Sequence, residues 1–440
     1  MAEKLDFLRD DVTTKASAEE LRMLQNPSET RIITMIHNKY YDLTDFKHPG
    51  GPVAIALISN RDGTELFESH HLYSTKSIPS ILSRYEIPSN PKSLISSSDI
   101  YNWELTKSSE FTKALKDLAR QEIGQNIKIT WFRFFELTLI VLLAISQYIL
   151  FYQGYWFSVL TMPLTYWLVG VNTFHDAAHF GISWNWKINR LMTNFGFAFS
   201  APYTWYHQHV IGHHSFPNIP GKDPDLYHAP KVIRHSKDVR YRPAHFYQVF
   251  TFVFTWLLGV PLSLIFNGMM QSLRRESYNR VVVFGNSKYL NPNSLIFRFI
   301  IYFIITHVAP IAMHGMSFKG IVFSIIPIYL FSLFFMISSQ INHLTPSTTD
   351  QRSENFFVHQ ILTAHNVAVD NYLVYLFTGG LNMQIEHHLF PSVNHCHLRK
   401  LCPKVKKLCS EFGIKYSESK TLWGAICEHI DHLKIYSLKD

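Results

Sequence analysis

Long apolar stretches are confined to the part of the chain that follows residue 130. Before that point apolar and polar residues are mixed, whereas five later stretches of about 16–21 residues carry almost no charge. Such lengths are sufficient for a helix to cross a ~30 Å hydrocarbon layer. The stretches are 137–152, 155–174, 246–266, 295–313 and 321–341. The pattern predicts an all-α membrane domain preceded by a polar N-terminal region.

Two of the breaks between these stretches are short enough to be the tips of helical hairpins. The first two stretches are separated by Gln153-Gly154, and the last two by a loop around Gly315. The stretch 246–266 has basic residues on both sides, and positively charged loops prefer the cytosol. We therefore predict that it lies in the membrane interface or re-enters. Four transmembrane helices remain, at about 134–152, 155–174, 297–313 and 321–341.

The N-terminal 130 residues divide into three segments. Residues 1–29 are charged and contain no apolar run, so we expect an N-terminal extension without a secretory signal. Residues 30–88 contain two short β-prone runs, 32–36 and 40–43, and then short helical segments, which predicts a small α+β domain. Residues 89–130 open with proline and serine and are expected to form a linker.

Composition narrows the choice of partners. The net charge is +8 with neutral histidines, and hydrophobic residues make up 47% of the chain. The lysines and arginines lie largely in loops between apolar stretches, where membrane topology and anionic lipid explain them better than nucleic acid does. We therefore expect contact with membrane lipid and no nucleic-acid partner.

The histidines cluster beside the ends of the predicted hairpins. A pair four residues apart follows the second apolar stretch, and three more fall within six residues further on. A Gln-Ile-Glu-His-His segment follows the last stretch, and one histidine stands just beyond that stretch. A spacing of four residues places two side chains on one helical face. The candidate site residues are His175, His179, His209, His213, His214, His343, Gln384, His387 and His388.

A redox metal centre is the chemistry that so many imidazoles favour. Imidazole is a good iron ligand, and eight histidines can hold two irons with positions left open for dioxygen. Zinc is the alternative metal by ligand type, although a structural zinc site needs only four ligands. Soluble di-iron bundles use carboxylates, which are scarce near these clusters. We therefore expect Asp176 and Glu386 to orient imidazoles rather than bind metal.

Other histidines are placed outside the ligand set. His207 points elsewhere if the second cluster is helical. Five more are expected to be structural or surface residues: His307, His314, His365, His395 and His397.

A second candidate metal site lies within residues 30–88. His48 opens a His-Pro-Gly-Gly turn, and Phe67 is followed by His70 and His71. Glycines let the backbone pass close to a flat cofactor. A histidine on each side of a haem plane gives a low-spin electron-transfer centre with no open position.

These residues carry two resemblances. Residues 30–88 resemble cytochrome b5 from Tyr40 through Gly51 and again over Phe67–His71, which implies axial haem ligation by His48 and His71. One departure is Pro88, where the family usually has glycine; it lies at the exit of the domain rather than at the haem.

Residues 131–440 resemble the membrane fatty acid desaturases through three histidine boxes. Glutamine at Gln384, together with an N-terminal cytochrome b5 domain, is typical of the front-end desaturases. The spacing of the second box is similar to that of a delta-5 and delta-4 subgroup. This resemblance implies haem b, two Fe in a di-iron centre, and O2 as co-substrate. It also implies the catalytic set His175, His179, His209, His213, His214, Gln384, His387 and His388.

The resemblance also implies an activity and a location. A front-end desaturase inserts a cis double bond into a polyunsaturated acyl chain, with delta-5 favoured and delta-4 or delta-6 possible. Electrons would come from NADH-cytochrome b5 reductase, and the substrate would be a fatty acyl-CoA or a phospholipid acyl chain. The haem domain and the histidine boxes would face the cytosol from the endoplasmic reticulum membrane.

Three alternatives stay open at this point. A sphingolipid long-chain-base desaturase shares the fused domain and the glutamine box, and a hydroxylase can use the same iron chemistry. A non-catalytic membrane haem electron carrier would need only the N-terminal domain and an anchor. The histidine boxes argue against such a carrier, because an anchor has no use for them.

Overall fold

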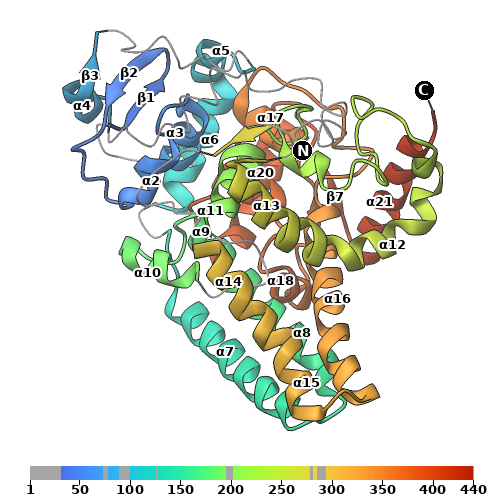
Figure 1. The fold of residues 1–440 in the computed structure, drawn as a ribbon. Coiled ribbons are helices and arrows are strands. Elements are labelled where there is room, and N and C mark those ends of the chain that lie inside the picture. The colour runs from blue at the N-terminus through green and yellow to red at the C-terminus, as the bar shows by residue number, and fades with distance from the viewer. Residues whose placement is uncertain are drawn as a thin grey trace.

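The chain forms a small mixed domain followed by a much larger helical part. The computed structural model describes residues 31–72, 78–88, 100–124, 127–194, 202–277, 281–284 and 294–439. Figure 1 shows the small domain in blue at one side and long helices that converge on a tip below. The predicted extension 1–29, and residues 89–99 at the start of the predicted linker, lie outside the described residues.

The small domain contains a three-stranded antiparallel sheet. Strands β1 (Ile33–Ile36), β2 (Lys39–Asp42) and β3 (Glu86–Ile87) pair in that order. His37 and Asn38 both have positive φ, the conformation of a tight two-residue hairpin turn. The helices of the domain are α2 (Pro52–Leu57), α3 (Thr64–His71), α4 (Ile78–Leu82) and the short η2 (Ser83–Tyr85). The two predicted strands are confirmed.

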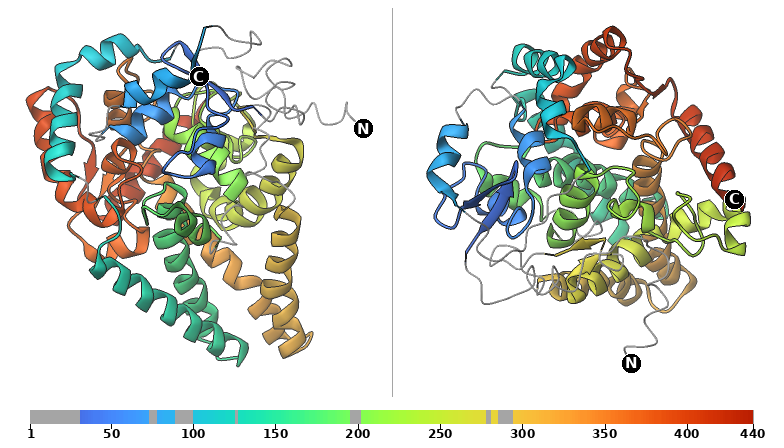
Figure 2. Two further views of the ribbon diagram at one scale, coloured as in Figure 1. Left: turned by 90° about the vertical axis from the view of Figure 1, so that its left-hand side faces the viewer. Right: turned by 90° about the horizontal axis from the view of Figure 1, so that it is seen from above.

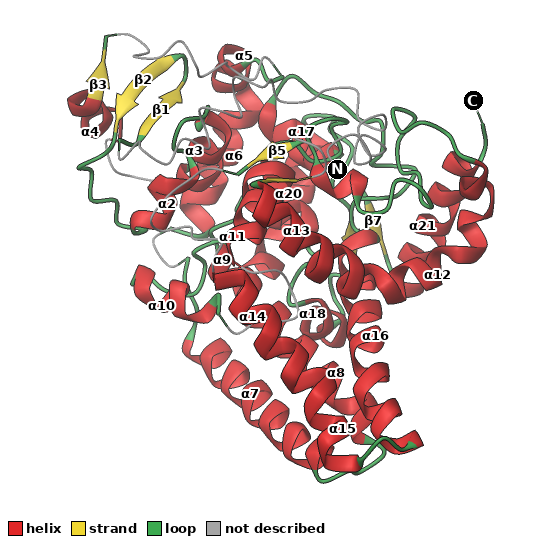
Figure 3. Ribbon diagram, in the orientation of Figure 1, coloured by secondary structure: helices red, strands yellow, loops and turns green. Residues whose placement is uncertain are grey.

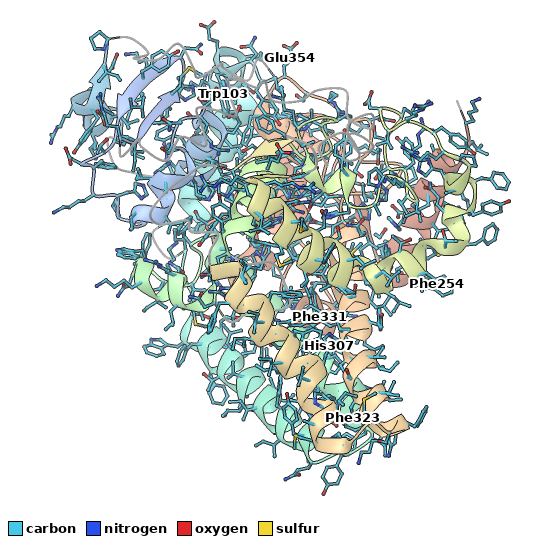
Figure 4. All side chains as sticks on the ribbon, viewed as in Figure 1. Trp103, Phe254, His307, Phe323, Phe331 and Glu354 are labelled. Atoms are coloured by element: carbon cyan, nitrogen blue, oxygen red, sulfur yellow. The ribbon has the colours of Figure 1, made fainter. Side chains whose placement is uncertain are left out.

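Two helices occupy the described part of the predicted linker. Helix α5 (Trp103–Ser108) begins after Asn102, whose side chain caps it, and α6 (Glu110–Glu122) follows. The Asn102 amide donates to the carbonyl of Glu354 over 2.9 Å, which ties α5 to the C-terminal half of the chain. Figure 4 labels Trp103 and Glu354 at the top of the molecule, where these segments meet.

Two helical hairpins form the tapering part of the molecule. In the first, α7 (Trp131–Tyr152) packs on α8 (Ser158–Val169) and the π-helical turn η3 (Gly170–Phe174). In the second, α14 (Ser294–Phe303) continues into η8 (Ile304–Val308) and α15 (Ala309–His314), and the last two pack on α16 (Phe318–Gln340). Both hairpins extend to the same end in Figures 1 and 2. Phe132 on α7 is 70% exposed, as expected for a side chain that faces lipid.

The third apolar stretch runs across the hairpins instead of along them. It forms η6 (Pro243–Tyr247), α12 (Gln248–Leu258), the π-helical η7 (Gly259–Asn267) and α13 (Gly268–Arg274). Figure 1 shows α12 and α13 near the broad end of the hairpins, oblique to α16. This arrangement suits the interfacial placement expected from its basic flanks, and that placement stays a prediction.

Among the described residues, four helical segments are long and apolar enough to cross a membrane. They are Trp131–Tyr152, Pro243–Arg274, Ile296–His314 and Phe318–Gln340. The number of candidate spans equals the four expected from the sequence, but one of the four segments is different. The predicted span 155–174 is replaced by Pro243–Arg274, because polar residues such as Asn172 and Thr173 lie within the second stretch.

The remaining elements form a helical layer around the candidate site, shown with its short strands in Figure 3. The helices are α9 (His175–Ala178), α10 (Trp186–Met192), α11 (Pro202–Trp205), η4 (Tyr206–His213), η5 (Pro224–Tyr227), α17 (Phe356–Leu362), α18 (Tyr372–Thr378), α19 (Gln384–Leu389), η9 (His395–His397), α20 (Leu398–Glu411) and α21 (Leu422–Ser437). The strands are β4 (Glu276–Ser277), β5 (Val282–Val283), β6 (Asn366–Val367) and β7 (Glu418–Ser419). The expected architecture, a small α+β domain followed by an all-α membrane domain, is confirmed.

Candidate metal centre and haem site

The first histidine box follows the first hairpin without a break. The π-helical turn η3 leads directly into α9, which begins at His175. The His179 amide donates to the His175 carbonyl over 3.2 Å, and the two rings lie 4.9 Å apart. Both side chains are buried. The two histidines, spaced four residues apart as expected, therefore place their imidazoles side by side.

The second box lies on a π-helical segment, and this winding changes which histidines meet. In η4 the backbone hydrogen bonds span five residues instead of four, a feature often found at functional sites. Accordingly His209 Nε2 lies 3.2 Å from Nε2 of His214, five residues later. His213 Nε2 is turned instead toward His343 Nε2, 3.2 Å away.

The third box completes the cluster from the C-terminal half. Helix α19 begins at Gln384 and carries His387 and His388, all buried. His343 stands three residues beyond the end of α16, and its Nε2 lies 2.7 Å from Gln384 Nε2. The asparagine before it, Asn342, donates to Gln384 Oε1 over 3.1 Å and so fixes the direction of the amide.

All nine residues predicted from the sequence are brought together, and their imidazoles form two groups. In the first group, His175 Nε2 lies 3.0 Å from His209 Nε2, and His387 Nε2 lies 3.0 Å from His214 Nε2. In the second group, His388 Nε2 lies 3.1 Å from His343 Nε2. Donor atoms within 4.8 Å of one another define two sets of imidazoles alone, His175, His179, His209 and His387, and His213, His343 and His388. His214 lies between the sets, with its ring 4.3 Å from that of His388. Two more sets include a carboxylate: His175, Asp176 and His395, and His209, His213 and Asp225.

The donor set fits two metal ions. Two imidazole nitrogens bound at right angles to one ion, about 2.1 Å from it, lie about 3 Å apart, which is the spacing found here. Both ring nitrogens of His179 are buried without a hydrogen-bond partner. A buried polar atom without a partner is costly, and a metal ion bound to one of these nitrogens would satisfy it.

Burial keeps most of these imidazoles neutral. It lowers the pKa of His175 to about 4 and that of His343 to about 3. Burial and neighbouring imidazoles together hold the pKa of five others well below the usual value: His179, His209, His214, His387 and His388. A neutral imidazole keeps a lone pair free for a metal.

His213 differs from its neighbours because carboxylates surround it. Burial acts to lower its pKa, but the charges of Asp223 and Asp225 outweigh burial and raise the pKa to about 9. Its Nδ1 lies 3.1 Å from Asp223 Oδ2, which turns Nε2 toward His343. A metal ion that binds Nε2 must therefore displace a proton.

A relay of side chains orients His387. Its Nδ1 lies 2.9 Å from Nε2 of His395, whose Nδ1 donates to the carbonyl of Gly379 over 2.5 Å and also lies 2.9 Å from Asp176 Oδ1. Such a chain fixes the ring and the tautomer of a metal ligand. The expectation that Asp176 orients an imidazole agrees with this geometry, although it does so through His395, which the sequence suggested was structural or at the surface.

Glu386 has another role. Its carboxylate accepts from Tyr416 over 2.8 Å and from Asn366 over 2.8 Å, and Cys402 Sγ lies 3.2 Å away. These contacts anchor α19 to α20 and to the segment around β6. The expectation that Glu386 orients an imidazole of the cluster is not met.

Three further partners of the cluster were not foreseen. Gln360 Oε1 lies 2.8 Å from His388 Nδ1, and the carbonyl of Thr363 lies 2.9 Å from His343 Nδ1. Asp223 is the third. Gln360 and Thr363 lie on or beside α17, far in the sequence from any histidine box, and no local pattern marks them. Asp223 belongs to a Lys-Asp-Pro-Asp run after the second box, and that run is the one signal that could have drawn attention to it.

His207 and four of the five other excluded histidines lie apart from the cluster. His207 Nδ1 pairs with the carbonyl of Tyr203 over 2.8 Å. His307, His314, His365 and His397 pair with or pack on other residues of the fold.

The second candidate site lies in the small domain. The rings of His48 and His71 face one another edge to plane, with centroids 6.0 Å apart. His71 Nδ1 donates to the carbonyl of Phe67 over 2.8 Å, which leaves Nε2 free for a haem iron. His70 points away and contacts Phe180 instead. The pair suits axial haem ligation by His48 and His71.

Comparison with known proteins decides the family. The fatty acid desaturase family model matches residues 150–420, which is more than half of the chain. The chain belongs to the fatty acid desaturase family. A second model, the cytochrome b5-like haem/steroid binding domain, matches residues 17–90.

Several characterised relatives align over nearly the whole chain. "Probable Delta(5) fatty acid desaturase C" of Dictyostelium discoideum is 27% identical over 93% of this chain and 92% of its own. "Acyl-lipid (8-3)-desaturase B" of the same organism is 28% identical over 91% and 90%. "Acyl-lipid (8-3)-desaturase" of Mortierella alpina is 25% identical over 92% and 93%. The chain is therefore a membrane oxidoreductase of the desaturase family with a fused cytochrome b5-like domain.

In this desaturase, an apolar cavity of about 840 Å³ is separated from the cluster by the rings of Phe335 and Trp205. It lies between the segment 227–232 and the crossing helices α12, η7 and α13, and Leu262 and Phe335 line it. The Phe335 ring lies 6.4 Å from that of Trp205, which packs 4.4 Å from His209. The volume is in the range of ligand sites.

Proposed function

We propose that this desaturase is a front-end enzyme that inserts a cis double bond between an existing double bond and the carboxyl end of a polyunsaturated acyl chain. The observation that carries the proposal is the convergence of eight imidazoles from four separate segments, with an apolar cavity on the far side of Trp205 and Phe335. The names of the relatives favour delta-5 chemistry, and delta-4 and delta-6 are the other positions to test.

The eight histidines of the cluster would hold two iron ions. His175, His179, His209, His214 and His387 surround one position, and His213, His343 and His388, with Gln384 beside them, surround the other. A pair of redox-active irons supplies the one-electron steps that O2 reduction requires. In the overall reaction, one hydrogen leaves each of two adjacent methylenes of the acyl chain. O2 takes up these two hydrogens together with two further electrons and two protons, and forms two waters.

The protein's own part in the reaction is to hold the acyl chain and to exclude water. The cavity beside Phe335 and Leu262 would take the chain, with Phe335 and Trp205 between it and His209. Lys231 and Arg274 also line the cavity and suit a phosphate-bearing carrier. The relatives' names, which print the word acyl-lipid, make a lipid-linked chain such as a phospholipid the first substrate to test and acyl-CoA the second.

The haem domain, residues 30–88, would supply the electrons. Haem b held by His48 and His71 carries one electron at a time and offers no open position. NADH-cytochrome b5 reductase is the proposed source of electrons. The desaturase domain would span residues 131–440 in the endoplasmic reticulum membrane, with the haem domain and the histidines at the cytosolic face.

Expression in a host that lacks polyunsaturated acyl chains tests this function. Host cells are fed C20 and C18 polyunsaturated fatty acids, and double-bond positions in each lipid class are read by mass spectrometry. A new cis bond on the carboxyl side of the existing ones is expected. A new hydroxyl group, a bond in a long-chain base, or no product would contradict the proposal.

A further inference from the structure

The small domain contacts the desaturase domain directly beside the metal cluster. His70, at the end of α3, places its ring 6.4 Å from that of Phe180, at an interplanar angle of 74°. Phe180 is the residue after His179, and His70 is the residue before His71. The contact between His70 and Phe180 therefore joins the neighbour of a proposed haem ligand, His71, to the neighbour of a proposed iron ligand, His179.

The position of Phe180 is held from several sides. Its φ is +59°, a left-handed conformation that a bulky residue adopts only when its surroundings impose it. Its amide donates to the carbonyl of Ala177 over 3.0 Å, and its own carbonyl accepts from Lys128 Nζ over 2.8 Å. The other face of its ring stacks on Tyr206, 6.3 Å away, at the start of η4.

The small domain is held so that this contact persists. Gly51, with φ of +87°, lies so close to Trp186 that an added Cβ would come within 2.5 Å of the indole Cγ. On the opposite side, Glu68 of α3 reaches Lys116 of α6 over 3.6 Å and Lys107 of α5 over 3.9 Å. The domain is therefore wedged between α10 and the helices of the linker.

We propose that Phe180 is the positioning residue through which the haem domain passes electrons to the metal centre, by way of its contact with His70. The inference rests on the proposed electron-donor role of the haem domain. In each step one electron would pass from a haem held by His48 and His71 to a metal ion held by the histidine cluster. Two such steps supply the two electrons that the reaction needs beyond those of the substrate, and the two protons come from water.

Stopped-flow spectroscopy of the full chain, loaded with haem and iron, tests the inference. The reduced protein is mixed with O2 and a polyunsaturated acyl lipid, and the oxidation of the haem is followed by its absorbance. We expect Phe180→Leu to slow haem oxidation about tenfold or more, because the looser contact no longer fixes the two centres relative to each other. Phe180→Tyr keeps an aromatic ring and should keep the rate.

Two controls separate this role from simple docking or damage. Trp186→Leu changes a contact of the same interface outside the proposed route, and it should slow haem oxidation much less than Phe180→Leu. Haem content, iron content and the product formed after chemical reduction of the metal centre should be the same in all variants.

The possible failures are distinguishable. An unchanged rate in Phe180→Leu, or equal slowing in Trp186→Leu, would overturn the role of Phe180. If the haem of the unmodified protein is not oxidised faster when the lipid is present, the electron-donor role itself fails, and this inference fails with it.

Discussion

At the scale of single residues, the histidine cluster depends on partners outside the proposed ligand set. His395 lies 2.9 Å from His387 and is itself held by the carbonyl of Gly379, with Asp176 close to the same nitrogen. Its neighbour His397, two residues later, is also buried but pairs with the backbone carbonyl of Lys128 over 2.7 Å. The two histidines offer a matched comparison of a positioning residue and a structural one.

We expect His395→Ala to weaken metal binding about 10–100-fold, because His387 loses the partner that fixes its ring. His397→Ala removes a buried imidazole of the same segment and should leave metal affinity unchanged. Titration of metal-free protein with Fe²⁺ under anaerobic conditions measures both. Equal affinity for the two variants would show that His395 does not orient a ligand.

The sequence could identify the histidines that converge but not the residues that orient them. The boxes at 175–179, 209–214 and 384–388 stand out because histidines are rarely so crowded, and His343 stands just beyond an apolar stretch. His395 and Gln360 carry no such local pattern. Their contacts arise from segments that meet only in the folded chain, so a single sequence offered no sign of them.

At the scale of elements, short helices hold the two domains together. Glu68 on α3 is buried and lies 2.7 Å from His37 Nε2, as well as near Lys107 and Lys116. Burial acts to raise the pKa of Glu68, but these partners outweigh it and lower the pKa from its ordinary value. A carboxylate whose pKa is lowered by folding stabilises the folded state at pH values above the pKa it has in the unfolded chain. This contribution is lost as the pH falls through the pKa of the folded state.

We therefore expect Glu68→Gln to destabilise the haem domain by about 1–3 kcal/mol at neutral pH. The difference from the unmodified protein should shrink as the pH falls below about 4.5, where the free carboxyl is protonated in the unfolded chain. Thermal unfolding followed by haem absorbance between pH 3 and 7 measures it. Glu110→Gln, in an exposed pair with Lys113, is the control and should change stability by less than about 0.5 kcal/mol.

The crossing helices α12 and η7 form one wall of the cavity, and their outer face is apolar. Phe254 lines the cavity and is also 68% exposed, and Figure 4 labels it at the outer edge of the molecule. Leu262 lines the cavity, whereas Phe250, on the same run of helix, does not. A bulkier residue at position 262 should therefore obstruct an acyl chain in the cavity, whereas a bulkier residue at position 250 should not.

We expect Leu262→Trp to reduce desaturation about tenfold or to move the double bond, with unchanged iron content. Phe250→Trp should have neither effect. Product analysis of both variants in the expressing host checks this. Unaltered products from Leu262→Trp would place the acyl chain elsewhere.

The secondary structure of these elements followed from the sequence only in part. Apolar runs predicted the hairpins, and the strands of the small domain were located to within a residue. The π-helical turns η3 and η4 were not foreseen, because nothing in the residue types distinguishes them from α-helix. Yet the winding of η4 decides that His209 meets His214 and that His213 meets His343.

At the scale of the whole molecule, the hairpin tips point away from the haem domain and the metal cluster (Figures 1 and 2). Met316, at the tip between α15 and α16, is 82% exposed. Lys47 lies beside His48 in the small domain and is exposed. If the hairpins span the bilayer, these two positions lie on opposite sides of it.

Cysteine labelling in sealed microsomes tests this topology. We expect Lys47→Cys to react with a membrane-impermeant maleimide in intact vesicles, and Met316→Cys to react only after permeabilisation. The unmodified protein provides the background of its own four cysteines. Labelling of Met316→Cys in intact vesicles would contradict the proposed orientation.

The most direct measurement of the central claim is the iron content of the purified full-length protein, compared with its haem content. If the eight clustered histidines hold a di-iron centre beside one haem, the protein should contain about three irons for each haem. His213→Ala should lose iron without losing haem, and His207→Ala should keep both. One iron for each haem in protein that is active, or a stoichiometric content of zinc in its place, would contradict the account.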